Sequence, residues 1–191
     1  MFVHCEGAIF RPLNKNEVQY APIFLIGFMC SGKTRIGREL AVSMRRKHVD
    51  IDRAIEGKVG PLLPFFEQKG EAEFRRIEAA TLAQLVTEKD LIVSCGGGTP
   101  ITGDNLQLML RAGTVIWLDV PFDVLMPRIE RAGGDRPLLS GLKGDALRER
   151  VKQLLTDREP TYAKAHMIVQ AADEPATIAM RIRRMLDLQA R

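Results

Sequence analysis

Short apolar runs alternate along this chain with longer stretches in which apolar residues recur every three to four positions. The short runs suit buried strands, which we expect at residues 23–26, 48–52, 91–95, 114–118 and 167–169. The longer stretches predict helices at about 33–46, 71–87, 102–111, 122–131, 145–158 and 175–188. Strands that alternate with helices form parallel sheets with helices on both faces. The pattern therefore predicts an α/β fold.

Two stretches fall outside this pattern. Residues 1–20 have no clear hydrophobic period, and we interpret them as an N-terminal extension. The remaining residues, 21–191, are within the size range of a single domain. Residues 53–66 are expected to be irregular, because glycines and prolines interrupt any long helix there: Gly57, Gly60, Pro61 and Pro64.

Composition excludes several classes of protein. Its 46% hydrophobic content is ordinary for a globular protein, and no apolar run approaches the ~20 residues that span a bilayer. The first residues lack the charged-then-apolar order of a signal peptide, so we expect a cytoplasmic protein with no membrane partner. A net charge of +4 is too small to indicate nucleic-acid binding, but it suits anionic small molecules. The cysteines Cys5, Cys30 and Cys95 lie too far apart for a zinc or disulfide pattern.

A phosphate-binding loop lies between the first predicted strand and the first predicted helix. The pattern G-x-x-x-x-G-K-[ST] is met by Gly27, Phe28, Met29, Cys30, Ser31, Gly32, Lys33 and Thr34. At a helix N-terminus, unpaired backbone N–H groups and the helix dipole favour an anion. Lys33 would add a positive charge at the β- and γ-phosphates, and the Thr34 hydroxyl would bind Mg²⁺. We predict a nucleotide phosphate site.

Two carboxylates follow at the end of the predicted strand 48–52. Residues two apart on an extended chain point to the same side, so Asp50 and Asp52 are expected to face the phosphate loop together. Ligands of open α/β sheets bind beyond the carboxyl ends of the strands. The alternative is a solvated acidic turn that caps the next helix.

The next helix and strand carry further candidate groups. Arg75 and Glu78 are three residues apart, so the carboxylate can hold the guanidinium, whereas Arg76 is expected to be a solvated surface residue. Gly96, Gly97 and Gly98 follow the strand 91–95 directly. Three glycines suit a main chain that closely approaches a ligand, although a flexible turn is the alternative.

A glycine-bounded stretch, residues 133–144, is typical of a mobile flap, with Arg136 placed before a stiffening proline. An arginine delivered by a closing flap can stabilise charge on a transferring phosphoryl group. An ordinary surface loop is the alternative.

Taken together, these features resemble the shikimate kinases over roughly residues 22–188. The motifs that carry the resemblance are Gly27–Thr34, Asp50-x-Asp52, Gly70-Glu71-x-x-Phe74-Arg75-x-x-Glu78, Gly96–Gly98, Arg136-Pro137-Leu138-Leu139 and Arg158-x-Pro160-x-Tyr162. The resemblance implies a three-layer fold of the P-loop, nucleoside-monophosphate-kinase type, with a five-stranded parallel sheet. It also implies a substrate-binding segment at about 50–80, a lid at about 132–145, and a monomer.

The activity implied by this resemblance is MgATP-dependent phosphorylation of the 3-hydroxyl of shikimate, a step of chorismate and aromatic amino-acid biosynthesis. The implied substrate-binding residues are Asp52, Arg75, Gly96, Gly97, Gly98 and Arg158. The implied ATP-binding residues are Gly27–Thr34, Arg35, Arg128 and Arg136, with Arg128 against adenine. Thr34 and Asp50 would serve Mg²⁺, and the catalytic residues would be Lys33, Asp52 and Arg136.

The chemistry of shikimate agrees with this assignment. Arginine forks bind a carboxylate bidentately, and Arg75 and Arg158 can supply two forks from different helices. Asp52 can accept hydrogen bonds from substrate hydroxyls. Because phosphoryl transfer needs mostly positioning and charge stabilisation, we assign Asp52 a positioning role first and a general-base role second.

Several residues depart from the family pattern, and two other functions stay open. Cys30 stands where a small residue is usual, and His166 stands where this family often has aspartate. Pro61 and Pro64 could reshape one wall of the pocket, and Trp117 is expected in the core. A gluconate-type or nucleoside-monophosphate kinase would share the phosphate loop and lid. A kinase-like binding protein would need no catalysis, although every charged residue expected for catalysis is present.

Overall fold

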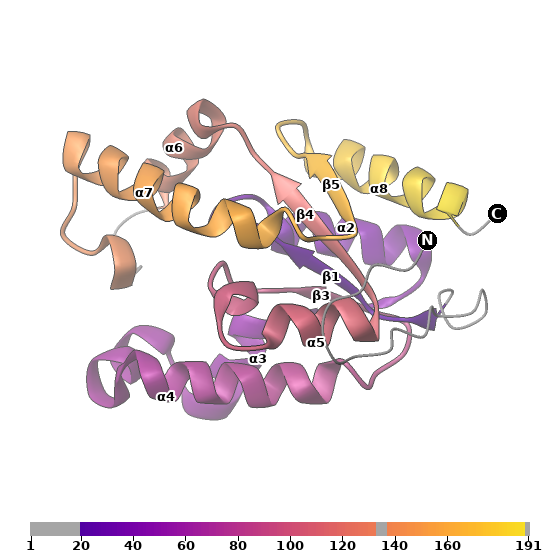
Figure 1. Cartoon of the computed structure of the whole chain (residues 1–191), viewed down its shortest axis with the longest axis horizontal. Helices are drawn as coiled ribbons and strands as arrows, with labels where there is room; N and C mark the ends of the chain where they lie inside the picture. Colours follow the sequence, from indigo (N-terminus) through magenta and orange to yellow (C-terminus); the bar gives the residue numbers. More distant parts are fainter. Residues whose placement is uncertain (1–19, 133–136, 190–191) are drawn as a thin grey trace.

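The computed structural model describes residues 20–132 and 137–189. These residues form three layers, with a parallel sheet between two layers of helices (Figure 1). The strands are β1 (Ile23–Ile26), β2 (Lys47–Asp50), β3 (Leu91–Ser94), β4 (Thr114–Asp119) and β5 (Met167–Gln170). The sheet has five strands in the order β2-β3-β1-β4-β5, and every pair is parallel. The predicted α/β architecture with a five-stranded parallel sheet is therefore confirmed.

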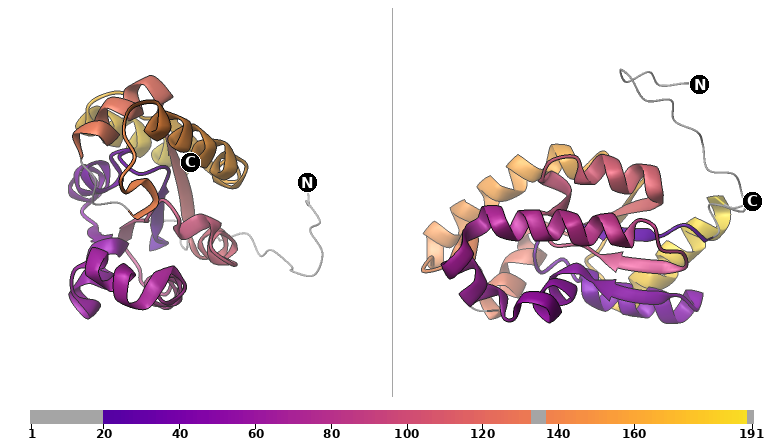
Figure 2. Two further views of the ribbon diagram at one scale, coloured as in Figure 1. Left: turned by 90° about the vertical axis from the view of Figure 1, so that its left-hand side faces the viewer. Right: turned by 90° about the horizontal axis from the view of Figure 1, so that it is seen from below.

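The helices connect the strands and cover both faces of the sheet. They are α2 (Lys33–Met44), α3 (Ile51–Val59), α4 (Leu62–Leu85), α5 (Asn105–Ala112), α6 (Phe122–Arg131), α7 (Gly144–Tyr162) and α8 (Pro175–Gln189). Two short 3-10 helices, η1 (Thr99–Ile101) and η2 (Pro137–Leu139), lie in the connections. In the left panel of Figure 2, α6, α7 and α8 lie above the sheet and α3 and α4 lie below it. No helix in the described ranges is long and apolar enough to cross a membrane.

Each face of the sheet has its own hydrophobic core. β1 and β3 are buried along their whole length, as expected for strands covered on both faces. One core lies against α2, α6, α7 and α8, and the other lies against α3, α4 and α5. Trp117 on β4 belongs to the second core, as predicted. This packing fixes the carboxyl ends of the central strands, where the candidate site residues begin.

The prediction of a strand over residues 48–52 was wrong at the carboxyl end of the strand. β2 ends at Asp50, and Asp52 lies in the first turn of α3. Asp50 is the N-cap of that helix, because its carboxylate accepts the Arg53 N–H at 3.3 Å. Asp50 and Asp52 therefore do not lie side by side on an extended chain. The alternative that the sequence left open, an acidic cap of the next helix, describes Asp50 correctly.

The predicted irregular stretch 53–66 is also wrong, because it belongs to α3 and to the start of α4. Gly60 ends α3, and Pro61 is the N-cap of α4, where a proline is tolerated because no intrahelical donor is lost. Gly70, with φ 78° and ψ 171°, breaks α4 into two segments, so that the predicted start at residue 71 matches only the second. A glycine at such a φ forms a kink that other residues rarely adopt.

Other boundaries differ by a few residues. The first helix ends at Met44 rather than near residue 46, because Arg45 adopts a left-handed φ of 55°. The stretch expected as a helix from residue 102 begins as η1, and α5 starts at Asn105. α7 continues past the predicted end at residue 158, through Pro160 to Tyr162. Residues 1–19 of the expected N-terminal extension, and Arg136 with most of the glycine-rich start of the flap, lie outside the described residues.

Candidate active site

The phosphate loop joins β1 to α2 at the centre of the sheet. Gly27 and Gly32 have φ values of 138° and 91°, which favour glycine. A Cβ atom on Gly27 would also lie 2.7 Å from the Leu118 carbonyl oxygen of β4. The loop can therefore pass close to the neighbouring strand, and it turns the first N–H groups of α2 toward one spot, as an anion site requires.

Lys33 is buried at the base of this loop. Its Nζ donates to the carbonyl oxygens of Gly27 at 2.9 Å and Phe28 at 2.7 Å, and to Ser31 Oγ at 3.3 Å. Burial lowers the pKa of Lys33 to about 8, although nearby carboxylates, Asp52 foremost, oppose that shift. A phosphate placed at this ammonium would favour its charged form further. The lysine is thus held in place for an anion by the loop itself.

Thr34 and Asp50 bring a hydroxyl and a carboxylate together beside the loop. Thr34 Oγ1 donates to Asp50 Oδ2 at 2.5 Å. Mg²⁺ prefers oxygen ligands and usually takes only one or two from the protein, with phosphates and water supplying the rest. In the described part of the chain no group of three or more His, Cys, Asp or Glu residues forms a metal site. This donor pair fits a magnesium ion that arrives with a nucleotide.

Cys30 adopts an unusual backbone conformation within the loop, with φ 61°. A residue with a Cβ is strained in this left-handed region, which suits glycine better. Its Sγ lies 3.6 Å from the Arg128 carbonyl oxygen of α6. The Arg128 guanidinium in turn donates to the Ala172 carbonyl oxygen at 3.3 Å. Arg128 therefore lies between the phosphate loop and the β5–α8 turn.

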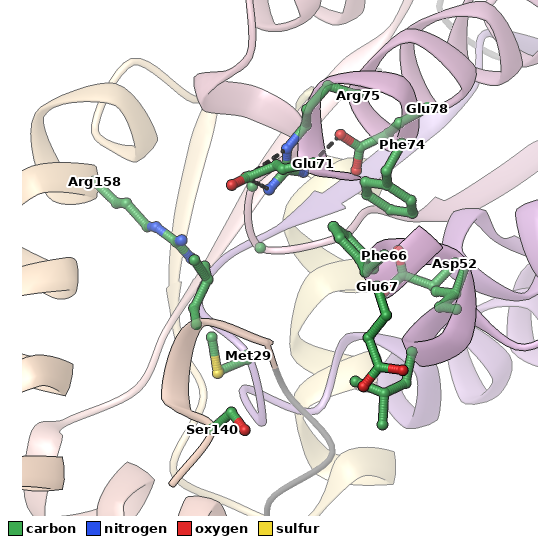
Figure 3. A pocket seen from close by; sticks show the side chains of 16 residues that line it. Met29, Asp52, Phe66, Glu67, Glu71, Phe74, Arg75, Glu78, Ser140 and Arg158 are labelled. Atoms are coloured by element: carbon green, nitrogen blue, oxygen red, sulfur yellow. Dashed lines mark hydrogen bonds and ion pairs between the residues drawn. The ribbon is translucent and has the colours of Figure 1, made fainter. Parts of the chain in front are cut away.

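A pocket of about 630 Å³ opens beside the loop (Figure 3). Its walls come from the start of α3, both segments of α4, the glycine triplet after β3, α7 and the end of η2. The lining residues are Met29, Asp52, Leu62, Leu63, Phe66, Glu67, Glu71, Phe74, Arg75, Glu78, Gly96, Gly97, Gly98, Leu138, Ser140 and Arg158. The structure thus brings all the predicted substrate-binding residues together in one pocket.

Arg75 is fixed in this pocket by two glutamates. Its Nη1 donates to Glu78 Oε2 at 2.8 Å, which confirms the predicted pair, and its Nη2 donates to Glu71 Oε1 at 2.9 Å. Glu78 is fully buried and also accepts the Thr99 hydroxyl at 2.5 Å. The dashed lines in Figure 3 show both contacts of Arg75. Because its carboxylate partners orient the guanidinium, little rotamer freedom is left to lose on binding a ligand.

Arg158 enters the pocket from α7, on a different side from Arg75 (Figure 3). Its residue exposure is only 3%, and its Nε has no hydrogen-bond partner among the described residues. The guanidinium carbon lies 5.3 Å from the centre of the Phe28 ring, a favourable cation–π distance. A buried arginine with an unused donor is costly unless an acceptor pairs with it. An anionic ligand between the two arginines would supply one.

Asp52 faces the same pocket from the first turn of α3. Burial, together with the negative charges of Asp50 and Glu78, raises its pKa to about 6, against the opposing effect of Lys33 and Arg75. A carboxylate with such a pKa is still ionised at neutral pH, yet it binds a proton more readily than a solvated aspartate. It can therefore accept hydrogen bonds from hydroxyls, and it can take a proton.

Each glycine of the triplet leaves room for a different charged side chain. A Cβ on Gly96 would lie 3.0 Å from Asp52 Oδ1, and one on Gly97 would lie 3.2 Å from Arg158 Nη1. A Cβ on Gly98 would overlap the Arg75 guanidinium, 2.6 Å from its Nη1. The alternative of a merely flexible turn is less suited to this packing. The triplet lets the main chain approach all three side chains at once.

Some expected residues lie elsewhere, and others were missed. Arg35 is exposed on α2 and borders a separate cavity of about 290 Å³ with Arg38, Glu39 and Glu174. Arg76 is exposed, as predicted, and pairs with Glu73. Glu71 was not among the predicted site residues, although its i,i+4 spacing to Arg75 was a usable signal. Phe66, Leu62 and Leu63 were missed because their segment was expected to be irregular.

Comparison with known proteins identifies the family. The family model described as "Shikimate kinase" matches residues 29–187. A shikimate kinase from Sulfurihydrogenibium sp. is 39% identical over 150 residues, which cover 78% of this chain and 87% of that protein. The structure of the Acinetobacter baumannii shikimate kinase in complex with shikimate matches with a TM-score of 0.83 and 30% identity. That match covers 92% of this chain and 97% of the other.

A gluconokinase from Sinorhizobium meliloti shares the fold at a lower level. Its structure matches with a TM-score of 0.58 and 15% identity, over 89% of this chain and 93% of that one. At that identity the likeness concerns the fold alone. The family model and the relatives above agree with the family resemblance of the sequence motifs. The chain therefore belongs to the shikimate kinase family.

Proposed function

We propose that this protein transfers the γ-phosphoryl group of ATP to the 3-hydroxyl of shikimate, with Lys33, Asp52 and Arg136 as catalytic residues. The observation that carries the proposal is the convergence of Arg75, Arg158 and Asp52 on one pocket beside the phosphate loop. Shikimate has one carboxylate and three hydroxyls on a six-membered ring. Two arginines match the carboxylate, and one aspartate matches the hydroxyls.

In this mechanism the substrate carboxylate lies between Arg75 and Arg158, and the unused Nε of Arg158 gains an acceptor. The ring then packs against the apolar wall of α4, which includes Phe66 and Phe74. Asp52 orients the 3-hydroxyl toward the γ-phosphate and takes its proton as the new P–O bond forms. ADP leaves as the β–γ bond breaks, so the reaction gives shikimate 3-phosphate, ADP and a proton.

Lys33 and Arg136 stabilise the charge on the transferring group, and Arg128 lies against adenine in this proposal. Thr34 and Asp50 would hold Mg²⁺, which neutralises charge on the nucleotide phosphates. The protein's own contribution is mainly positioning and electrostatic stabilisation, since a phosphoryl transition state has little covalent chemistry for side chains to perform. We further propose a cytoplasmic monomer that supplies chorismate biosynthesis, without a nucleic-acid or membrane partner.

A single assay tests the proposed reaction against its rivals. Purified protein with MgATP is followed for ADP release with shikimate, gluconate, a nucleoside monophosphate or no acceptor. We expect ADP release that depends on shikimate, and a product whose phosphorus NMR signal corresponds to a phosphate on the 3-hydroxyl. Gluconate-dependent release would favour the sugar-acid kinase, and binding of ATP without any turnover would favour a non-enzymatic protein.

Replacing Arg136 by alanine is expected to lower kcat at least tenfold while leaving shikimate affinity almost unchanged. The reason is that a lid arginine meets charge that develops only as the phosphoryl group transfers. Steady-state kinetics with both substrates varied would measure the effect. Arg76→Ala is the matched control, because Arg76 is exposed and pairs with Glu73 on the same helix. A near-normal kcat for Arg136→Ala would remove this residue from the mechanism.

A further inference from the structure

Tyr162 is a buried residue of this domain that the proposed mechanism does not use. It is the last residue of α7, one helical turn beyond Arg158, and only 1% of its surface is exposed. Its ring packs against Trp117 of β4, with the ring centres 5.9 Å apart. The ring thus belongs to the core, while the hydroxyl lies at the edge of the site.

The Tyr162 hydroxyl donates to the Gly97 carbonyl oxygen at 2.6 Å, across 65 positions of the sequence. Burial raises the pKa of Tyr162 to about 12, with the Arg158 guanidinium opposing the shift, so the phenol keeps its proton and acts as a donor. This hydrogen bond therefore joins the end of α7 to the middle of the glycine triplet.

That contact sets the orientation of a whole peptide unit. A trans peptide is planar, and its C=O and N–H groups point in opposite directions. The Gly97 carbonyl points to Tyr162, so the Gly98 N–H of the same unit points away from it. Gly97 and Gly98 both line the pocket. Glycines have no side chain to hold them in one conformation, and without this bond the peptide unit would turn more freely.

Arg158 is held by the same arrangement. It lies four residues before Tyr162 on one helix, and its Nη1 lies 3.2 Å from the position of a Cβ on Gly97. The tyrosine therefore ties α7 to the triplet at this point. Its hydroxyl lies beside two parts of the pocket, the Gly97–Gly98 peptide and the Arg158 guanidinium, and it helps to set their relative position.

We propose that Tyr162 is a positioning residue for the acidic substrate, which aligns the Gly97–Gly98 peptide with Arg158 through its hydroxyl. The inference rests on the proposed function, because it assumes that shikimate binds in this pocket. The proposal adds a residue that sets the bound geometry of the acceptor, and we expect a much smaller effect on nucleotide binding. The phosphate loop passes close to Gly97, since a Cβ on Gly97 would lie 3.3 Å from the Met29 nitrogen, but the loop is held by its own hydrogen bonds from Lys33 to the carbonyl oxygens of Gly27 and Phe28.

The test is Tyr162→Phe, which removes the hydroxyl and keeps the ring. We expect the KM for shikimate and its Kd by calorimetry to rise about five- to tenfold, as for the loss of one hydrogen bond. The KM for ATP should stay within twofold. The matched control is Tyr20→Phe, since Tyr20 is the chain's other tyrosine and is 46% exposed.

Trp117 provides a check on packing, because it is the single tryptophan of the chain and touches the Tyr162 ring. Its emission maximum should be the same in wild type and Tyr162→Phe. An unchanged shikimate KM and Kd would overturn the proposal, and so would equal rises in the KM for shikimate and for ATP. If the wild type itself showed no shikimate-dependent turnover, the proposed function would fail instead, which is a separate outcome.

Discussion

Replacing Asp52 by asparagine is expected to lower kcat at least about 100-fold and to raise the melting temperature at pH 7 by on the order of 5 °C. The kinetic loss follows from the two roles proposed for this carboxylate. Asparagine can still contact a substrate hydroxyl, but it cannot take its proton, and general bases contribute typically 10²–10⁴-fold. The positioning role alone would give a smaller loss.

The gain in stability follows from the raised pKa of Asp52. Burial beside Asp50 and Glu78 raises that pKa from 3.8 to about 6, so the folded protein binds the proton more tightly than the unfolded chain. The carboxylate therefore destabilises the fold above about pH 6, by about 2–3 kcal/mol at pH 7. This penalty disappears as the pH falls from about 6 toward 3.8. A neutral amide does not carry it.

Both effects can be measured on the same protein samples. Thermal melts at pH 7 and pH 4 should show a stabilised variant at the higher pH and a nearly normal one at the lower. The kcat of the wild type should fall as the pH drops through about 6, because Asp52 becomes protonated. Asp187→Asn is the control, since that exposed side chain of α8 makes a long ion pair with Arg183, at 3.9 Å. A variant with normal kcat would exclude Asp52 from proton transfer.

Most of the fold follows from features that are local in the sequence. The buried strands read as continuous apolar runs, and the helices that cover them read as amphipathic stretches, so β1, β3 and α6 lie where the pattern puts them. The phosphate loop is equally local, because its strand, its glycines and its lysine are consecutive. These are the cases in which neighbouring residues decide the structure.

The predicted secondary structure is wrong where a single residue has two possible structural roles. Asp50 can extend a strand or cap a helix, and the cap is favoured because Ile51 and Ile55 then reach the core together on one helix face. Pro61 suggested irregular chain, but a proline at a helix start costs little. The wall of the pocket that contains Phe66 was missed for that reason. Sequence spacing alone did not distinguish these outcomes.

Sequence spacing also does not predict that the site residues meet in one pocket. Arg75 and Arg158 lie on different helices, and the sequence identifies them as pocket residues only through a family resemblance. The physical link between them is the glycine triplet, which packs against both guanidinium groups. This contact is formed by the tertiary structure.

Gly98→Ala is expected to raise the KM for shikimate at least about 30-fold while the protein still folds. Gly98 has φ −91° and ψ −17°, a conformation that alanine adopts readily, so the backbone itself is not strained. The new Cβ would overlap the Arg75 guanidinium, which is the far end of a long side chain and can shift if its bonds to Glu71 and Glu78 are partly given up. Arg75 must then leave its present position, and we expect the loss of a bidentate contact worth about 2 kcal/mol.

The matched control is Gly57→Ala on α3, where an added Cβ would have no neighbour within 4 Å. Alanine is the better helix former by about 1 kcal/mol, so this variant should be slightly more stable and have a normal KM. For Gly98→Ala, part of the contact with the buried Glu78 is lost, and the melting temperature should fall by a few degrees. Circular dichroism would verify the fold. A KM within twofold of the wild type would mean that shikimate does not rely on Arg75 in its present position, and the carboxylate would then have to be bound by Arg158 alone.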